Sequence, residues 1–279
     1  MEKLIIDINN PFHPLNIEKY EGDQMFESFE LDFISGSPSI RKIDEIRCDW
    51  GDGNIQNIHG ETKHVYIKDR FPLFYRIEIE YDPESNTDFL NLRNNKYIKR
   101  VMGPLPRVST SLLTGYFKGC SNLEMVGHDV FKYNTEHRNI SELFCDCTNL
   151  EYIDRDSKLS QIAVNIDGIL MNCSKFTELP KIFNFKCVET ANKAFMNMRS
   201  LTRIPMNYLE DAINLKYAVS IFEDCTNLRQ MGYNPLYNCK NLKDVSRGFA
   251  GIDTNLLKVK DNFFTYIPKG CVIDDIFTN

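Results

Sequence analysis

The chain has 279 residues, of which 42% are hydrophobic and 26% are charged, values that are ordinary for a folded globular protein. Its net charge of −6, its pI of about 5.5 and the lack of a concentrated Lys/Arg cluster argue against nucleic acid as a main partner. No apolar run reaches the ~18 residues that a membrane-spanning helix needs, so we expect no membrane insertion.

The N-terminal part of the chain, residues 1–85, shows the pattern of short β-strands. Apolar and polar residues alternate over short runs, and glycine or proline lies between the runs. The runs are LIIDI at Leu4, MFESFELDF at Met25, IDEIRCDW at Ile43, HVYI at His64 and LFYRIEIEY at Leu73. Alternation with a period of two, broken by turn formers, predicts a small β-sandwich.

One turn in this region has a recognisable motif, which runs from Asp49 to Ile67 and continues into the strand YRIEIEY. It resembles the core of a PKD-type, immunoglobulin-like domain on the residues Trp50, Gly51, Asp52, Gly53, His64, Tyr66 and Tyr75. The glycines permit the positive φ of a tight turn. Calcium binding by Asp49 and Asp52 is the alternative, but calcium takes about 6–8 oxygen ligands and the segment offers two carboxylates.

The polar segment 82–95 is rich in Asn and is expected to be a linker or a first cap. After it, Ile98, Val101 and Leu105 look like an incomplete opening turn of a repeat. The chain then repeats itself. Copies of a short motif begin at Phe117, Phe144, Leu170, Phe195, Phe222 and Phe249, so neighbouring starts differ by 27, 26, 25, 27 and 27 residues. A fixed period in this range predicts a solenoid in which each copy buries its apolar edge against the next.

Four positions in each copy, spaced by three, are apolar and form columns down the stack. The second column is Cys120, Cys147, Cys173, Met198, Cys225 and Ile252. With the motif Phe-x-x-Cys-x-x-Leu, the chain resembles BspA-type leucine-rich repeats over about residues 95–270. The resemblance implies a mainly β fold with short helices: an immunoglobulin/PKD-like β-sandwich (1–85), a leucine-rich-repeat solenoid of six to seven turns (86–270) and a C-terminal cap or tail (271–279).

The chemistry-bearing residues do not form a known catalytic or metal motif. Because Met198 and Ile252 share the column of four cysteines, we interpret that column as a buried core ladder rather than as disulfides or zinc ligands. The five His residues lie outside any nameable triad or zinc spacing. We therefore expect no enzymatic activity, no cofactor and no metal.

A binding surface is expected beside the repeat strands, where acidic residues give way to basic ones along the stack. The candidate partner-binding residues are Glu124, Glu151, Tyr152, Glu178, Arg203, Arg229 and Lys258. Such a gradient could steer a dipolar partner or self-association into a homo-oligomer. A solvated face with a chance order of signs is the alternative.

These patterns predict a non-enzymatic binding or structural protein whose partners are proteins of a virion or surface assembly, or host-surface carbohydrate or protein. The first residues, MEKLIIDINNPFHPL, lack the apolar core of a secretory signal. By analogy with repeat and immunoglobulin-like modules of phage particles, we expect a bacteriophage virion component that serves assembly or host attachment. The alternatives are a bacterial cell-surface adhesin and an intracellular scaffold in the cytoplasm.

Overall fold

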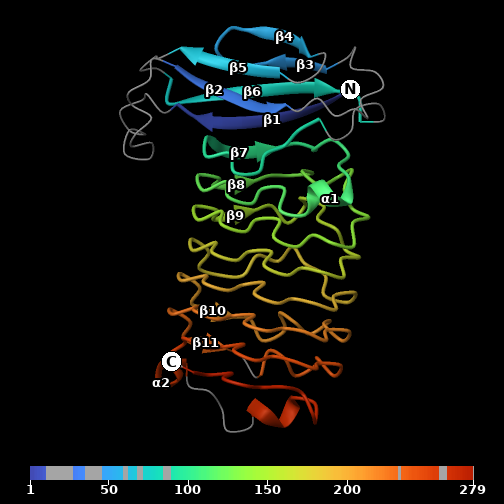
Figure 1. Cartoon of the computed structure of the whole chain (residues 1–279), viewed down its shortest axis with the longest axis vertical. Coiled ribbons are helices and arrows are strands. Elements are labelled where there is room, and N and C mark those ends of the chain that lie inside the picture. The colour runs from blue at the N-terminus through green and yellow to red at the C-terminus, as the bar shows by residue number, and fades with distance from the viewer. Residues whose placement is uncertain are drawn as a thin grey trace.

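The protein is mainly β-structure with very little helix, as a computed structural model shows (Figure 1). The structure describes residues 1–10, 28–34, 46–58, 62–67, 72–83, 89–231, 234–257 and 263–278. Its strands are β1 (Glu2–Asn9), β2 (Ser28–Ile34), β3 (Ile46–Asp49), β4 (Ile55–Ile58), β5 (Thr62–Ile67), β6 (Phe74–Tyr81), β7 (Ile98–Met102), β8 (Met125–Val126), β9 (Tyr152–Ile153), β10 (Arg203–Ile204) and β11 (Gln230–Met231). Short helical segments are α1 (Thr110–Leu113), α2 (Thr254–Leu257) and η3 (Phe263–Tyr266).

A seven-stranded sheet in the order β4-β3-β6-β1-β7-β8-β9 runs from the N-terminal region into the repeats. The strands β4, β3, β6, β1 and β7 pair antiparallel, and β7, β8 and β9 pair parallel. A separate antiparallel pair, β2 with β5, lies beside this sheet. Tyr66 of β5 contacts Tyr75 of β6, with ring centroids 4.4 Å apart, so aromatic side chains join the two sheets.

The Trp50 turn is held by its own side chains. Gly51 and Gly53 have φ values of 78° and 93°, and a Cβ on Gly51 would lie 2.4 Å from the Arg76 carbonyl oxygen. Asp52 accepts hydrogen bonds from the Asn54 amide and faces His64 Nε2 at 2.8 Å. The carboxylate of Asp52 is thus engaged within the turn, which favours the structural interpretation of this motif.

The first copy of the repeat, expected as an incomplete opening turn at Ile98, Val101 and Leu105, begins at Leu92. The Cys120 thiol donates to the Leu92 carbonyl, as the Cys147 thiol does to that of Phe117. Asn94 has a positive φ, as Gly119 does one copy later. Residues 92–101 therefore form a further copy, and the expected linker supplies its start. We call residues 92–278 the repeat stack.

Successive copies stack through parallel backbone pairing and through aromatic rings. One ladder of pairing runs from residue 139 through 165, 190, 217 and 244 to 272. Inside the stack, Phe117 stacks on Phe144 with ring centroids 5.5 Å apart, and Phe195, Phe222 and Phe249 stack in the same way. At the far end, Phe277 stacks on Phe249, so residues 271–278 cover the last copy.

The segment after the first residue of each copy, such as Phe117 or Phe144, is a turn, one of the two structures (short helix or tight turn) that a spacing by three suits. The reason is a column of residues in the left-handed region: Gly119, Asp146, Asn172, Asn197, Asp224 and Gly251, with φ between 59° and 75°. Gly, Asn and Asp adopt this region most readily. A positive φ in every copy ends any helix before it completes a second turn, which explains the low helix content.

Candidate functional site

The fourth of the apolar columns, at Val126, Ile153, Leu179, Ile204 and Met231, makes a second ladder of short strands. Within the residues that the structure describes, this ladder has one interruption. β8 pairs with β9, Glu178 bridges to Arg203, and β10 pairs with β11, all parallel. Between β9 and the segment 177–179, both fully described, no strand pairing or backbone hydrogen bond forms. The seven-stranded sheet therefore ends at β9, whose outer edge is open.

Pro180 removes one hydrogen-bond donor at this break. Elsewhere in the ladder, the amide of Gly127 donates to the Val101 carbonyl and that of Asp154 to the Val126 carbonyl, at 2.8 Å each. The next residue in this series is Pro180, which has no N–H to donate to the Ile153 carbonyl. One hydrogen bond of the ladder is thus missing at this position. Pro205 holds the same position in the next copy, where Arg203 still bridges to Glu178, so the proline contributes to the break but is not sufficient for it.

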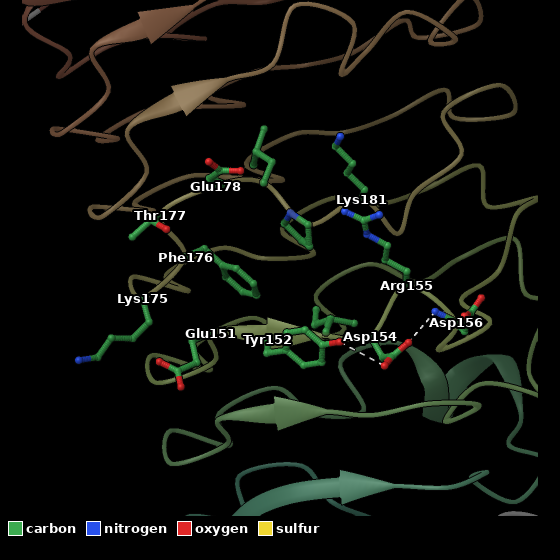
Figure 2. A pocket seen from close by; sticks show the side chains of 13 residues that line it. Glu151, Tyr152, Asp154, Arg155, Asp156, Lys175, Phe176, Thr177, Glu178 and Lys181 are labelled. Carbon is green, nitrogen blue, oxygen red and sulfur yellow. Dashed lines mark hydrogen bonds between the residues drawn. The ribbon is translucent and has the colours of Figure 1, made fainter.

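The break opens a groove of about 870 Å³, which we call the inter-repeat groove. It is lined by residues 151–156 on one wall and residues 175–181 on the other (Figure 2). Tyr152 is 50% exposed in it, whereas Phe176 is 5% exposed and forms part of its floor. Two neighbouring copies therefore contribute an open cleft with an aromatic surface.

Some charged side chains in the groove have hydrogen-bond or ion-pair partners, and others have none. The Asp154 carboxylate accepts hydrogen bonds from the Tyr152 hydroxyl at 3.2 Å and from the Asp156 amide at 2.8 Å. The first of these bonds, with the nearby negative charge, raises the pKa of Tyr152. Glu178 pairs with Arg203 at 2.7 Å. In contrast, Arg155, Lys175 and Lys181 have no ion pair within the described part of the chain.

The groove gathers part of the surface predicted from the sequence. Glu151, Tyr152 and Glu178 line it, and Arg203 reaches it through its ion pair with Glu178. The other predicted residues lie apart from it: Glu124 pairs with Lys99 at 3.3 Å, and the Arg229 guanidinium donates to the carbonyls of Thr226 and Leu228. Lys258 falls outside the described residues. Sequence analysis missed the three cations of the groove, because they lie outside the column positions that it compared.

One cluster at the edge of the groove has the donor set of a metal site. His128, Asp154 and Asp156 each offer a ligand atom, and these atoms lie within 4.8 Å of one another. A nitrogen and two carboxylate oxygens would suit a borderline divalent cation such as zinc. The cluster is solvent-exposed, with the His128 side chain 65% exposed and its Nε2 also 3.1 Å from Asp129. Its members come from adjacent copies, so no linear spacing indicated it.

The cysteine column has the character of a core and not of a reactive site. Cys120, Cys147, Cys173 and Cys225 are free and buried, as the repeat pattern predicted. Burial raises the pKa of the Cys120 and Cys225 thiols to about 12, and that of Cys147 and Cys173 well above the usual value. These thiols stay protonated near neutral pH, and each donates to a backbone carbonyl of the preceding copy.

A scan against protein-family models finds no match for this chain, and a search of curated proteins finds none at a significant level. Within the described residues, no helix is both long enough and apolar enough to cross a membrane.

Proposed function

We propose that this protein is a non-enzymatic binding protein, built from an immunoglobulin/PKD-like β-sandwich and a BspA-type leucine-rich-repeat solenoid. The continuous sheet through β1 and β7 supports this architecture, because it fixes the N-terminal strands rigidly to the first copy. In such a protein the N-terminal unit both caps the repeat stack and offers a second docking surface.

The inter-repeat groove is the observation that carries the binding role. It combines an exposed aromatic ring, Tyr152, with three cations that have no ion pair in the described structure. Tyr and Arg side chains are among the usual anchors of a binding site. We place the ligand there, and not along the whole charge gradient, because the ion pair of Glu178 with Arg203 joins opposite signs at the middle of that gradient.

We further propose that this binding serves assembly or host attachment in a bacteriophage virion, with partners that are virion proteins or host-surface molecules. A bacterial surface adhesin and an intracellular scaffold are the competing settings. Peptide mass spectrometry on purified particles and on surface and cytosolic fractions separates them. A fixed ratio to a capsid protein supports the virion, and enrichment elsewhere contradicts it.

The binding role is tested with the full-length protein and two matched variants. Tyr152→Ala alters the groove, and Tyr217→Ala removes a comparably exposed tyrosine, 40% exposed, from the other ladder. Cross-linking mass spectrometry in the fraction that contains the protein identifies its neighbours. We expect Tyr152→Ala, and not Tyr217→Ala, to lose a cross-linked partner. Equal partner recovery by both variants would place the binding site elsewhere.

A further inference from the structure

The open edge of β9 suggests what kind of ligand the inter-repeat groove takes. In the intact rung before it, the Glu124 carbonyl accepts hydrogen bonds from the amides of Glu151 and Tyr152 at 3.1 and 3.2 Å. By the same pattern, the Glu151 carbonyl should accept from Thr177 and Glu178, but it does not. Carbonyls on one wall and amides on the other are therefore left without the partners that the rest of the ladder supplies.

These backbone carbonyls and amides, which have no partner across the groove, are arranged as in a β-ladder from which one strand is missing. On the β9 wall, the Glu151 and Ile153 carbonyls point away from β8, which takes up the amides of Tyr152 and Asp154. On the other wall stand the amides of Thr177 and Glu178. Strands pair at about 4.8 Å, and an exposed edge is a template for an added strand. Figure 2 shows the walls standing further apart than β8 and β9.

The charged side chains of the groove indicate which charge a bound strand would need in order to complement them. Figure 2 shows Arg155 and Lys181 on opposite walls at one end, and Lys175 at the other end. Two like charges that face each other repel unless an anion lies between them. Four carboxylates also line the groove. Asp154 and Glu178 are already engaged, and Asp156 lies 3.8 Å from Lys158. Glu151 lies at the same end as Lys175 (Figure 2). An acidic side chain at the end of an inserted segment that faces Arg155 and Lys181 complements these two cations.

We propose that the inter-repeat groove binds an extended, acidic peptide segment of a protein partner, which adds as a strand between β9 and residues 177–179. This inference rests on the proposed function and names the partner of the same groove. An anionic carbohydrate could meet the cations, but it does not present alternating N–H and C=O groups at strand spacing. β-Augmentation uses the backbone for affinity and alternate side chains for specificity, and both are provided here.

The test uses the full-length protein and a fluorescein-labelled octapeptide of alternating threonine and glutamate. Comparison probes are the same peptide N-methylated at alternate residues, octaglutamate, and a hyaluronan oligosaccharide. Fluorescence polarisation gives the affinities, and amide hydrogen exchange reports on residues 177–179. We expect the unmodified peptide to bind and to protect those amides, and N-methylation to weaken binding about tenfold or more, since it removes backbone donors.

Charge variants supply the matched control. Lys181→Glu should weaken peptide binding about tenfold or more, whereas Lys240→Glu, which reverses an exposed lysine outside the groove, should leave it within about twofold. Equal affinity for the N-methylated peptide, or tighter binding of hyaluronan, would overturn the strand proposal. So would the absence of any binding above octaglutamate. If the Tyr152→Ala variant still loses its cross-linked partner in those cases, the proposed binding role stands and only the strand mode is wrong.

Discussion

Asp7 and Arg100 form an ion pair across the junction between the N-terminal strands and the repeat stack. Asp7 Oδ2 of β1 lies 3.0 Å from Arg100 Nε of β7, and the Asp7 side chain is fully buried. On its other side, Asp7 accepts hydrogen bonds from Arg76 of β6. One carboxylate thus joins three neighbouring strands, with register partners directly opposite it on both sides. The N-terminal region and the first copy are in this way parts of one sheet.

Replacing Asp7 should weaken this junction. We expect Asp7→Ala to lower the free energy of unfolding by about 1–3 kcal/mol, because two guanidinium groups lose their shared partner. Arg76 and Arg100 are 48% and 31% exposed, so water takes over part of the lost interaction and keeps the cost moderate. Trp50 is the only tryptophan and reports on the N-terminal strands, while circular dichroism reports on the whole chain. The two urea transitions should coincide in the wild type and separate in the variant; coincidence in both would show that Asp7 does not couple the parts.

Glu2 makes the same junction sensitive to acid. Hydrogen bonds from Tyr133, and then from Lys132, lower the pKa of Glu2 below its usual 4.5. A lowered pKa means that the folded state favours the charged carboxylate, so its contribution is complete above 4.5 and is lost as pH falls through the folded value. We expect Glu2→Gln to cost up to about 1 kcal/mol at neutral pH and nothing once Glu2 is protonated. Urea titrations of both proteins from pH 7 to acid measure the difference; a gap that persists in acid contradicts the assignment.

The left-handed column makes a different prediction, about Asn172. Its φ is 67°, and its side chain donates to Asp146 and accepts from Asn197. We expect Asn172→Ala to cost about 2–3 kcal/mol, since it loses both hydrogen bonds and places Cβ in an unfavourable conformation. Asn172→Gly loses the same bonds but tolerates this φ, so it should cost less by about 1 kcal/mol. Equal losses in urea denaturation would rule out backbone strain as a contributor.

Much of the repeat stack could be predicted because its columns are set by local chemistry. The column positions of Phe117 and of Cys147 recur at fixed spacing, because the residue at each position fills an equivalent buried site in every copy. Both residues are fully buried, as expected. The copy at 92–101 was expected only as an incomplete opening turn, because Leu92 and Asn95 replace the Phe and Cys that mark the other copies. Its identity depends on hydrogen bonds to the next copy, which no spacing rule reveals.

The groove could not be predicted for a related reason. Pro180, whose missing N–H contributes to the break, is visible in the sequence, but only the register of the ladder shows which carbonyl loses its donor. The pairing of Glu178 with Arg203 likewise depends on which copies lie side by side. The order of charges along the column suggests a gradient from acidic to basic residues. In the structure, two of these residues, Glu178 and Arg203, lie on adjacent copies and form an ion pair.

The cysteines provide a test of the buried ladder. Seven of the nine thiols are buried, and only Cys187 and Cys271 are partly accessible. We expect a thiol reagent at pH 8 to modify these two in the folded protein and the other seven only on unfolding, because the reactive thiolate is suppressed by burial. Mass spectrometry of the labelled peptides reads out each site. Rapid labelling of Cys147 or Cys173 in the native protein would contradict the packing of the column.

Pro180 is the residue whose replacement should close the inter-repeat groove. Pro180→Ala restores an N–H that can donate to the Ile153 carbonyl, as the Asp154 amide donates to Val126. The new hydrogen bond, worth about 1 kcal/mol, is offset by the greater freedom of the unfolded chain, so stability should change little. The decisive measurement is amide hydrogen exchange, which should show protection at residues 177–180 without any ligand. Pro205→Ala is the matched control, because Pro205 holds the same position in the next copy, where Arg203 already bridges to Glu178. If Pro180→Ala leaves these amides unprotected, a cause other than the proline holds the ladder open.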